Sequence, residues 1–223
     1  MSETIDALAI GETTFPFHSF DHVGPLLAGA FDDDVAVTTT TDRDDLLDLS
    51  DYDVVVDYLT DSRLTDDQQE SLLGFVRNGG GYVGVHCATD LTSVAPEDPE
   101  DVIEHVEDPI PELRDLLGGH FVTHPEQQEF AVEIVDRDHP ITEGVVDFTV
   151  FDEPYQVEVD DDVRVLARMD RDDEMDGMPV AWVKPYGEGR VFYLSLGHTD
   201  EALEDSTVGK LLSRGARWTA DRS

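Results

Sequence analysis

Short apolar runs alternate with amphipathic stretches through the first half of the chain, and this alternation constrains the fold more than any other feature. The runs that we expect as strands are Ile5–Gly11, Val35–Thr40, Tyr52–Leu59 and Tyr82–His86. Helical patterns occupy Val23–Phe31 and Thr65–Arg77, and the second ends at Asn78-Gly79. Strands separated by helices in this way predict an α/β fold, with a parallel sheet covered by helices on both faces.

The second half of the chain has strand-like runs with almost no helix between them. These runs are Phe130–Val135, Val146–Phe151, Val163–Ala167, Pro179–Val183 and Arg190–Leu196. An excursion rich in proline and acid over Leu91–Pro111 and a short helix near Glu112–Leu117 precede them, and a last helix is expected over Glu201–Ala216. Consecutive strands predict an antiparallel β extension of the sheet. Because no linker or internal repeat interrupts the chain, we expect a single domain over residues 1–223.

Acidic residues outnumber basic ones by 52 to 14, which gives a formal net charge of −38. Phosphate backbones and anionic lipids attract basic patches, and the chain has no Lys/Arg cluster. We therefore expect no nucleic acid and no membrane surface as a partner. Molar salt screens such self-repulsion, because the Debye length falls to about 3 Å. The charge predicts a halophilic protein of a high-salt cytoplasm. A cationic partner fits less well, since the acid is spread along the whole chain.

The sequence lacks the marks of a membrane-spanning or secreted protein. No run approaches the roughly 18–20 apolar residues of a transmembrane helix, and the first residues form no signal segment. Cys87 is the single cysteine, which excludes an internal disulfide. We expect a soluble, cytoplasmic protein. No heptad or edge pattern singles out an interface, so the sequence leaves a homo-oligomer open.

Several histidines and an acidic segment follow predicted strands. His18 follows the first strand, His86 ends the run GYVGVH, His198 follows the last strand, and His120 lies in the segment GGHFVTHP. The acidic segment Asp152–Tyr155 follows the strand that ends in FTVF. Ligands of open α/β sheets bind beyond the carboxyl ends of the strands. The sequence therefore predicts that imidazoles and a carboxylate converge on one edge of the sheet.

Each of these residues also has a structural interpretation. A single histidine at a strand end is more often a hydrogen-bonded loop residue than a catalyst, and only the joint occurrence favours function. The other histidines are expected at the surface, in turns or in structural roles: His22, His105, His124 and His139. The glycines at Gly79–Gly81 precede a strand, so they predict a helix stop and a tight turn and not a phosphate-binding loop.

The chain resembles the ThuA-like (trehalose-utilisation) family over most of its length. The resemblance lies in five segments, in this order: NGGGYVGVHCATD, GGHFVTHP, RDHPITEG, FDEPYQ and GRVFYLSLGHTDEAL. That family belongs to the class I glutamine amidotransferase-like superfamily, so the resemblance implies a flavodoxin-like fold. It also implies a role with trehalose, a related disaccharide or a keto-sugar made by a partner dehydrogenase.

The resemblance to the superfamily includes a difference at the nucleophile. Its glutaminases carry cysteine as the third residue of a Gly-x-Cys-x-Gly elbow, whereas the corresponding segment Gly84–Ala88 reads GVHCA. His86 thus takes the nucleophile position, and Cys87 comes one residue late. The later His-x-Glu of the superfamily resembles His198-Thr199-Asp200. Without a thiolate at the elbow, we expect that the chain is not a glutamine amidotransferase.

Three hypotheses about the site stay open. In the first, His86, His120 and His198 bind a divalent metal such as zinc, with Glu153 or Asp200 as an oxygen ligand, in a metal-assisted enzyme. In the second, His86 and His198 form a metal-free acid/base pair that acts on a sugar derivative. In the third, the cluster belongs to a non-catalytic sugar-binding module.

The enzyme hypotheses share an expected set of residues and a geometric test. His86 and His198 are the expected catalytic residues of a hydrolase, lyase or isomerase. The side chains expected to bind the small-molecule sugar are His18, Glu153, Tyr155 and Asp200. An aromatic platform for the sugar could come from Tyr82, Phe121, Tyr155 and Trp182. Metal binding or catalysis needs at least two histidine nitrogens within about 4–5 Å of a common point.

Overall fold

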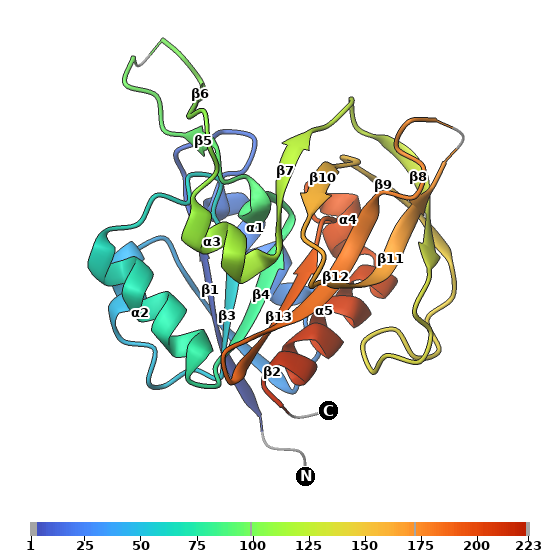
Figure 1. Cartoon of the computed structure of the whole chain (residues 1–223), viewed down its shortest axis with the longest axis horizontal. Helices are drawn as coiled ribbons and strands as arrows, with labels where there is room; N and C mark the ends of the chain where they lie inside the picture. Colours follow the sequence, from blue (N-terminus) through green and yellow to red (C-terminus); the bar gives the residue numbers. More distant parts are fainter. Residues whose placement is uncertain (1–3, 99, 172, 222–223) are drawn as a thin grey trace.

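The computed structural model describes residues 4–98, 100–171 and 173–221. Its centre is a mixed sheet of nine strands (Figure 1). In spatial order the strands are β2 (Val35–Thr40), β1 (Ile5–Gly11), β3 (Val54–Tyr58), β4 (Gly81–Val85), β13 (Gly189–Leu194), β12 (Pro179–Tyr186), β11 (Arg164–Asp170), β8 (Gln128–Ile134) and β9 (Phe148–Asp152). The first five are parallel to one another, and the last four are joined in antiparallel pairs. The predicted flavodoxin-like parallel sheet with an antiparallel extension is confirmed.

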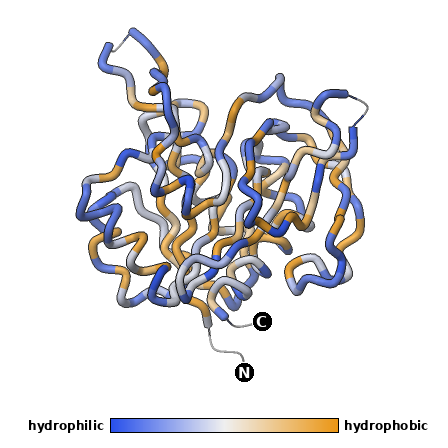
Figure 2. The backbone as a smooth tube through the Cα atoms, in the orientation of Figure 1, coloured by the Kyte–Doolittle hydropathy of each residue, from blue (hydrophilic) through white to orange (hydrophobic). Residues whose placement is uncertain are grey.

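Helices cover both faces of the sheet. They are α1 (Phe20–Gly29), α2 (Asp66–Arg77), α3 (Pro111–Leu117), α4 (Asp200–Glu204) and α5 (Ser206–Thr219), with 3₁₀ turns η1 (Arg43–Leu47) and η2 (His86–Thr89). Alternate residues of a strand face opposite sides. Accordingly Val54 and Val56 pack in the core beneath α1 and α5, whereas Val55 packs in the core beneath α2 and α3. Figure 2 shows apolar residues concentrated along the strands and polar residues in the outer loops.

Local sequence signals determine where the helices begin and end. The side chain of Thr65 accepts from Gln68 N–H and that of Gln68 accepts from Thr65 N–H, which forms a capping box for α2. The single final helix predicted over Glu201–Ala216 is wrong, because Asp205 divides it into α4 and α5. Asp205 has an extended backbone, and its carboxylate accepts from the N–H groups of Thr207 and Val208 at the start of α5.

Two small ribbons stand above the carboxyl ends of the parallel strands (Figure 1). One pairs β7 (Gly119–Thr123) with β10 (Gln156–Val159), and the other pairs β5 (Ser93–Val94) with β6 (Glu104–His105), both antiparallel. None of these four strands is predicted from the sequence, because each is short and at most one side of it is apolar. These ribbons add walls above the sheet edge where the predicted site lies.

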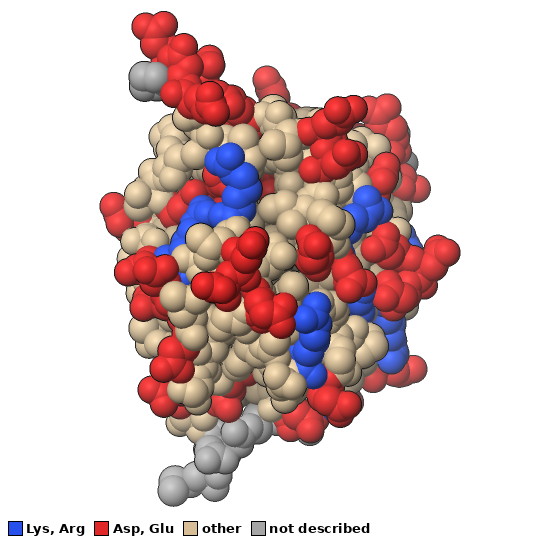
Figure 3. Space-filling view, turned by 60° about the vertical axis from the view of Figure 1, so that its left-hand side comes forward, with Lys and Arg blue, Asp and Glu red and all other residues tan. Residues whose placement is uncertain are grey.

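Acidic side chains dominate the surface. Figure 3 shows Asp and Glu distributed over the whole of the visible face, with a few separate Lys and Arg side chains among them. Arg217 is an example of a paired cation, because it binds the carboxylates of both Asp32 and Asp34. Among the described residues, no helix is both long and apolar enough to cross a bilayer.

Candidate metal centre

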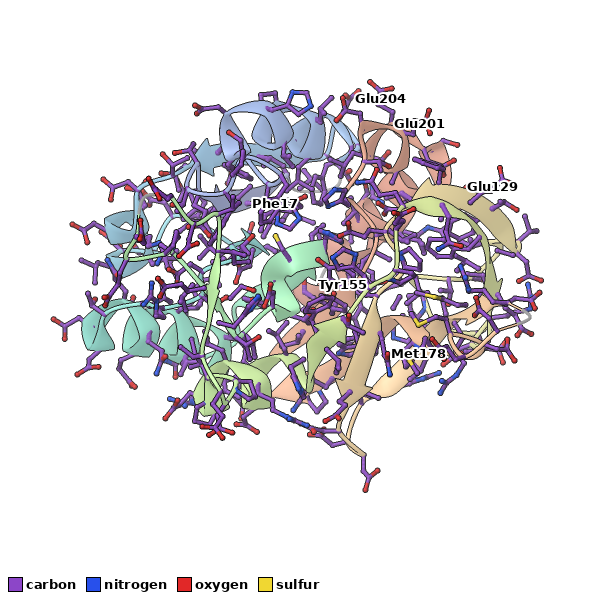
Figure 4. The ribbon with its side chains drawn as sticks, turned by 90° about the horizontal axis from the view of Figure 1, so that it is seen from above. Phe17, Glu129, Tyr155, Met178, Glu201 and Glu204 are labelled. Atoms are coloured by element: carbon purple, nitrogen blue, oxygen red, sulfur yellow. The ribbon has the colours of Figure 1, made fainter. Side chains whose placement is uncertain are left out.

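Four side chains from four separate connections meet at the carboxyl edge of the sheet. His18 lies in the loop after β1, His86 opens η2 after β4, Glu153 follows β9 and His198 follows β13. One ligand atom from each lies within 4.8 Å of the others, and we call these residues the four-residue centre. Figure 4 looks down onto this edge, where the labelled Phe17 and Tyr155 line the same cleft as the centre. The predicted convergence of imidazoles and a carboxylate is therefore present.

The spacing of the four ligand atoms suits a tetrahedral metal ion. Nδ1 of His198 lies 3.0 Å from Nε2 of His18, 3.2 Å from Nε2 of His86 and 3.3 Å from Oε2 of Glu153. The same Glu153 oxygen lies 3.5 Å from Nε2 of His86. Zinc bonds of 2.0–2.1 Å at tetrahedral angles place neighbouring ligand atoms about 3.3–3.4 Å apart. Four of the six separations among these atoms are close to this value, and all six are within 4.8 Å, so a small contraction of the cluster would complete a tetrahedral site.

Hydrogen-bond partners on the outer side of the rings orient His18 and His86, and the partner of His86 also fixes its tautomer. Nδ1 of His86 lies 2.9 Å from the carbonyl oxygen of Ser195, which can only accept, so this nitrogen carries the proton of the neutral ring. Nδ1 of His18 lies 2.8 Å from the hydroxyl of Thr60. Burial lowers the pKa of both His18 and His86 well below the ordinary value. Neutral rings with Nε2 toward the centre are the form in which histidine binds metals.

The backbone at His86 is strained. Its φ angle of +46° lies in the left-handed region, which bulky residues seldom adopt. The strained strand-to-helix turn corresponds to the elbow that the superfamily resemblance implies. The hydroxyl of Tyr193 donates to the His86 carbonyl at 2.7 Å and stabilises this turn. Burial raises the pKa of the neighbouring Cys87 thiol, which donates to the carbonyl of Tyr58. A thiol that keeps its proton is a weak nucleophile, which supports the expectation that glutaminase chemistry is absent.

Asp152 positions the loop that carries His198. Its carboxylate accepts from the N–H groups of Gly197 at 2.7 Å and of His198 and Thr199 at 3.1 Å each. Burial raises the pKa of Asp152 to about 7, although these hydrogen bonds oppose the shift. The sequence analysis included this residue only as part of an acidic segment. The structure gives Asp152 the positioning contacts, while Glu153 beside it supplies an oxygen to the centre.

Tyr155 contacts the centre directly. Its hydroxyl lies 2.8 Å from Nε2 of His86, and the two rings stack with centroids 4.2 Å apart. Since Nε2 of His86 is the unprotonated nitrogen, the hydroxyl donates to it. Burial raises the pKa of Tyr155 well above its ordinary value, so the phenol retains its proton at neutral pH. The predicted substrate-binding residue is thus a proton donor placed beside a candidate metal ligand.

A cleft of about 400 Å³ opens onto the four-residue centre. Its apolar lining comes from Phe17, Phe121, Tyr155 and Ile103. Its other polar residues are Asp90, Ser93, His105, His124 and Gln127. Apolar walls with a few convergent polar groups are typical of small-molecule sites of this volume.

A protein-family model described as ThuA, trehalose utilisation, matches residues 13–219. The chain belongs to the ThuA family. This membership supports a role in carbohydrate metabolism, as the name of the family indicates. No curated protein matches this ThuA-family chain.

Solved structures resemble the chain over almost its whole length. A ThuA-like protein from Parabacteroides merdae has a TM-score of 0.71 at 21% identity, with 98% of this chain and 90% of that chain covered. A cytoplasmic protein from Salmonella typhimurium has a TM-score of 0.69 at 14% identity, with 96% and 99% covered. A polyextremophilic β-galactosidase from the Antarctic haloarchaeon Halorubrum lacusprofundi matches at 18% identity and a TM-score of 0.62. This match covers 98% of this chain and 30% of the β-galactosidase chain. At these identities the likeness concerns the fold.

Two predicted site residues of this ThuA-family chain lie elsewhere. His120 is on β7, with Nε2 4.0 Å from Oε2 of Glu158, and it is outside the four-residue centre. Asp200 begins α4, and its exposed carboxylate accepts from Nε2 of His22 at 2.8 Å. His120 was placed by sequence proximity to a His-rich segment, and Asp200 by the His-x-Glu spacing. Of the predicted metal ligands, the structure brings His86 and His198 together.

The remaining histidines can be compared with their expected positions. His124 differs, because it lines the cleft with Nδ1 3.3 Å from Oε1 of Glu153. The spacing HFVTH contained a signal for this position, but the adjacent proline suggested a structural role. His105 is exposed as expected and also lines the cleft. His139 lies at the expected turn, where its carbonyl accepts from Thr142 N–H, and its ring is buried 5.1 Å from that of Trp218.

The predicted aromatic platform divides between cleft and core. Phe121 and Tyr155 line the cleft, with ring centroids 4.4 Å apart. Tyr82 and Trp182 are fully buried in the core beneath α2 and α3. Only the first pair is placed to contact a ligand.

Proposed function

We propose that this ThuA-family chain is a metal-dependent enzyme of carbohydrate metabolism that acts on an oxidised, keto form of a sugar. The observation that carries the proposal is the cluster of four ligand atoms within 4.8 Å of one another, in which Nδ1 of His198 lies 3.0–3.3 Å from the other three. Three imidazole nitrogens and a carboxylate oxygen that face one another repel unless a cation or shared protons lie between them. A divalent ion removes this repulsion at all four atoms together.

The donor set favours zinc or a related transition metal. Imidazole nitrogens suit Zn²⁺, Ni²⁺ and Fe²⁺, whereas Mg²⁺ and Ca²⁺ prefer oxygen ligands. When bound, the ion would act as a Lewis acid on a carbonyl or hydroxyl oxygen of the sugar. The outer hydrogen bonds of His18 to Thr60 and of His86 to Ser195 orient the rings in advance.

Two residues of the chain are placed to move protons in the cleft. Tyr155 carries a proton on its hydroxyl beside the centre, so it is suited to donate to an oxygen on which negative charge develops. His124 is partly exposed, and its Nδ1 lies 3.3 Å from Oε1 of Glu153. It therefore joins the centre to solvent and is suited to exchange a proton with a carbon or oxygen of the ligand. Proton transfer next to a carbonyl is the step common to isomerases and lyases of keto-sugars.

The second candidate is a metal-free acid/base pair formed by His86 and His198. Their facing nitrogens are 3.2 Å apart and could share a proton. Burial lowers the pKa of each ring, however, which disfavours the protonated form that such a pair needs. In a third reading, a non-catalytic binding module, the same cleft holds the sugar without turnover.

Metal content and turnover distinguish these candidates. Untagged protein is purified in high salt without chelator, and its metals are measured by mass spectrometry. We expect near-stoichiometric zinc or a related ion in the wild type and in His22→Ala, whose ring is exposed outside the centre. His86→Ala and His198→Ala should lose the metal and the turnover of keto-trehalose. A folded, metal-free wild type that turns over this sugar would favour the acid/base pair. Metal without turnover would favour the binding module.

A further inference from the structure

The wall of the cleft that includes Asp90, Ser93 and His105 is separate from the four-residue centre. Ser93 of β5 and His105 of β6 are directly opposite residues of one ribbon, and the Ser93 hydroxyl lies 3.2 Å from Nδ1 of His105. Oδ1 of Asp90 accepts from the N–H of Ser93 at 3.0 Å. These three residues line the same cleft as His18 and His198. They form one connected polar group, which we call the second wall.

The second wall is anchored to the body of the protein. The N–H of Ala95 donates to Oδ2 of Asp61 at 2.9 Å, and the N–H of Val106 donates to the carbonyl of Thr92 at 2.8 Å. Asp90 follows η2, which begins at His86, and it is only 6% exposed. The Asp90 carboxylate is therefore held in place before a ligand binds, which lowers the entropy cost of binding the ligand.

The chemistry of the second wall suits hydroxyl groups. A carboxylate accepts hydrogen bonds in a planar fork, which matches two neighbouring hydroxyls of a sugar ring. Nδ1 of His105 forms a hydrogen bond with the Ser93 hydroxyl, so Nε2 is the ring nitrogen left for a hydrogen bond with a ligand. Phe17 and Phe121 offer apolar surface to the C–H face of the same ring.

The second wall disfavours an anionic sugar unit. No Lys or Arg is among the described residues that line the cleft, whereas the carboxylates of Asp90 and Glu153 do line it. An ion at the four-residue centre would offset the charge of Glu153, but no Lys or Arg among the described lining residues offsets that of Asp90. A phosphate beside Asp90 would meet a carboxylate within a chain of formal net charge −38, so this wall is suited to an uncharged sugar unit.

We propose that Asp90, Ser93 and His105 form a second subsite, which binds neighbouring hydroxyls of an uncharged sugar unit beside the unit held at the four-residue centre. This inference rests on the proposed function, because it assumes that the cleft holds a sugar. It gives the ligand two connected units, one at each wall, and places the specificity for the non-reacting unit on the second wall.

Calorimetric titration of zinc-supplemented, untagged protein in high salt tests the subsite. The probes are trehalose, its keto form and trehalose 6-phosphate. Asp90→Asn retains Oδ1, which can still accept from Ser93 N–H, so the loop should keep its fold while the carboxylate charge is removed. In Asp90→Asn we expect trehalose and its keto form to bind at least about tenfold more weakly. In His105→Ala, which removes an exposed ring, we expect both sugars to bind about fivefold more weakly. The control Asp200→Asn changes a carboxylate outside the cleft and should bind as the wild type does.

The outcomes separate the subsite from the proposed function. Weaker sugar binding in Asp90→Asn, with unchanged zinc content and unchanged melting temperature, supports the subsite. Equal binding by Asp90→Asn, His105→Ala and the wild type overturns the subsite and leaves the metal-dependent function standing. Phosphorylated trehalose that binds the wild type as tightly as trehalose overturns the requirement for an uncharged ligand. A wild type that binds neither trehalose nor its keto form overturns both proposals.

Discussion

His86 can offer one lone pair to a ligand, and two groups compete for it. Its Nδ1 proton is donated to the Ser195 carbonyl, so the lone pair is at Nε2. The Tyr155 hydroxyl already donates to this atom at 2.8 Å. A metal ion at the four-residue centre needs the same lone pair. Metal binding would therefore release the Tyr155 hydroxyl toward the cleft, where it could donate to a ligand.

Removal of this hydroxyl should strengthen metal binding. In Tyr155→Phe we expect the zinc affinity to rise about fivefold, because a competing hydrogen bond worth about 1 kcal/mol is lost. A competition titration against a coloured chelator measures the affinity. Tyr186→Phe is the matched control, since its hydroxyl accepts from Arg77 at the end of α2 and touches neither the centre nor the loop of His198. Unchanged or weaker zinc binding in Tyr155→Phe would contradict the competition.

Asp57 gives the stability a pH dependence of known sign. Burial raises the pKa of this carboxyl from 3.8 to about 6, although Tyr82 donates to it at 2.6 Å. Between these two values the folded chain holds a proton that the unfolded chain has released, so this stabilisation is present at low pH and lost as the pH rises. Relative to Asp57→Asn, the free energy of unfolding should fall by about 2 kcal/mol from pH 4 to pH 7. Denaturant unfolding at several pH values measures the difference, and a pH-independent difference would refute it.

The elements of the parallel half were predictable because β1, β3 and β4 are apolar runs buried on both faces, and the more exposed edge strand β2 is a run rich in β-branched residues. The ends of β1 and β2 agree with the predicted runs to the residue, and the site rule for open sheets located His18, His86 and His198. The ribbons were missed because their pairing depends on tertiary packing and not on a local periodicity. For the same reason the place of His105 in the cleft had no distinct signal in the sequence, and for His124 the adjacent proline outweighed the spacing HFVTH.

One side chain accepts most of the hydrogen bonds between β9 and the loop after β13, and the Thr199 hydroxyl adds one more to the Phe151 carbonyl. Asp152 accepts from three backbone N–H groups of that loop, and Asp152→Ala would leave them without their acceptor in a buried position. We expect zinc affinity to fall at least about tenfold and the free energy of unfolding to fall by about 3 kcal/mol. Zinc titration and denaturant unfolding measure these effects. Asp200→Ala, which removes an exposed carboxylate on α4, should change neither; equal zinc affinity in Asp152→Ala would show that the loop holds its position unaided.

At the scale of the whole molecule, the excess of acidic residues changes the free energy of unfolding and not the fold. The chain has a formal net charge of −38, so its surface carboxylates repel one another in the folded state. Ion pairs such as those of Arg217 offset part of this repulsion. Figure 3 shows these carboxylates over much of the visible face, with some gathered on the segment that protrudes at its top. The halophilic habitat stays a prediction from this charge.

Salt should therefore stabilise the protein by screening. Between 0.1 and 2 M KCl we expect the melting temperature to rise by about 5–10 °C, which corresponds to roughly 2–3 kcal/mol for a chain of this length. Most of the rise should occur below about 1 M, where the Debye length reaches about 3 Å. Calorimetry with equal concentrations of sucrose is the control, because sucrose does not screen charge. A melting temperature that is independent of KCl would contradict the prediction.

The four ligand atoms come from residues 18, 86, 153 and 198, on both the parallel and the antiparallel half of the sheet. An ion held there would link strands that are distant in the chain. Neither half could then open without releasing the ion, so local fluctuations of the two halves would become a single cooperative event. Slow amide exchange in both halves would depend on one small site at the rim of the molecule.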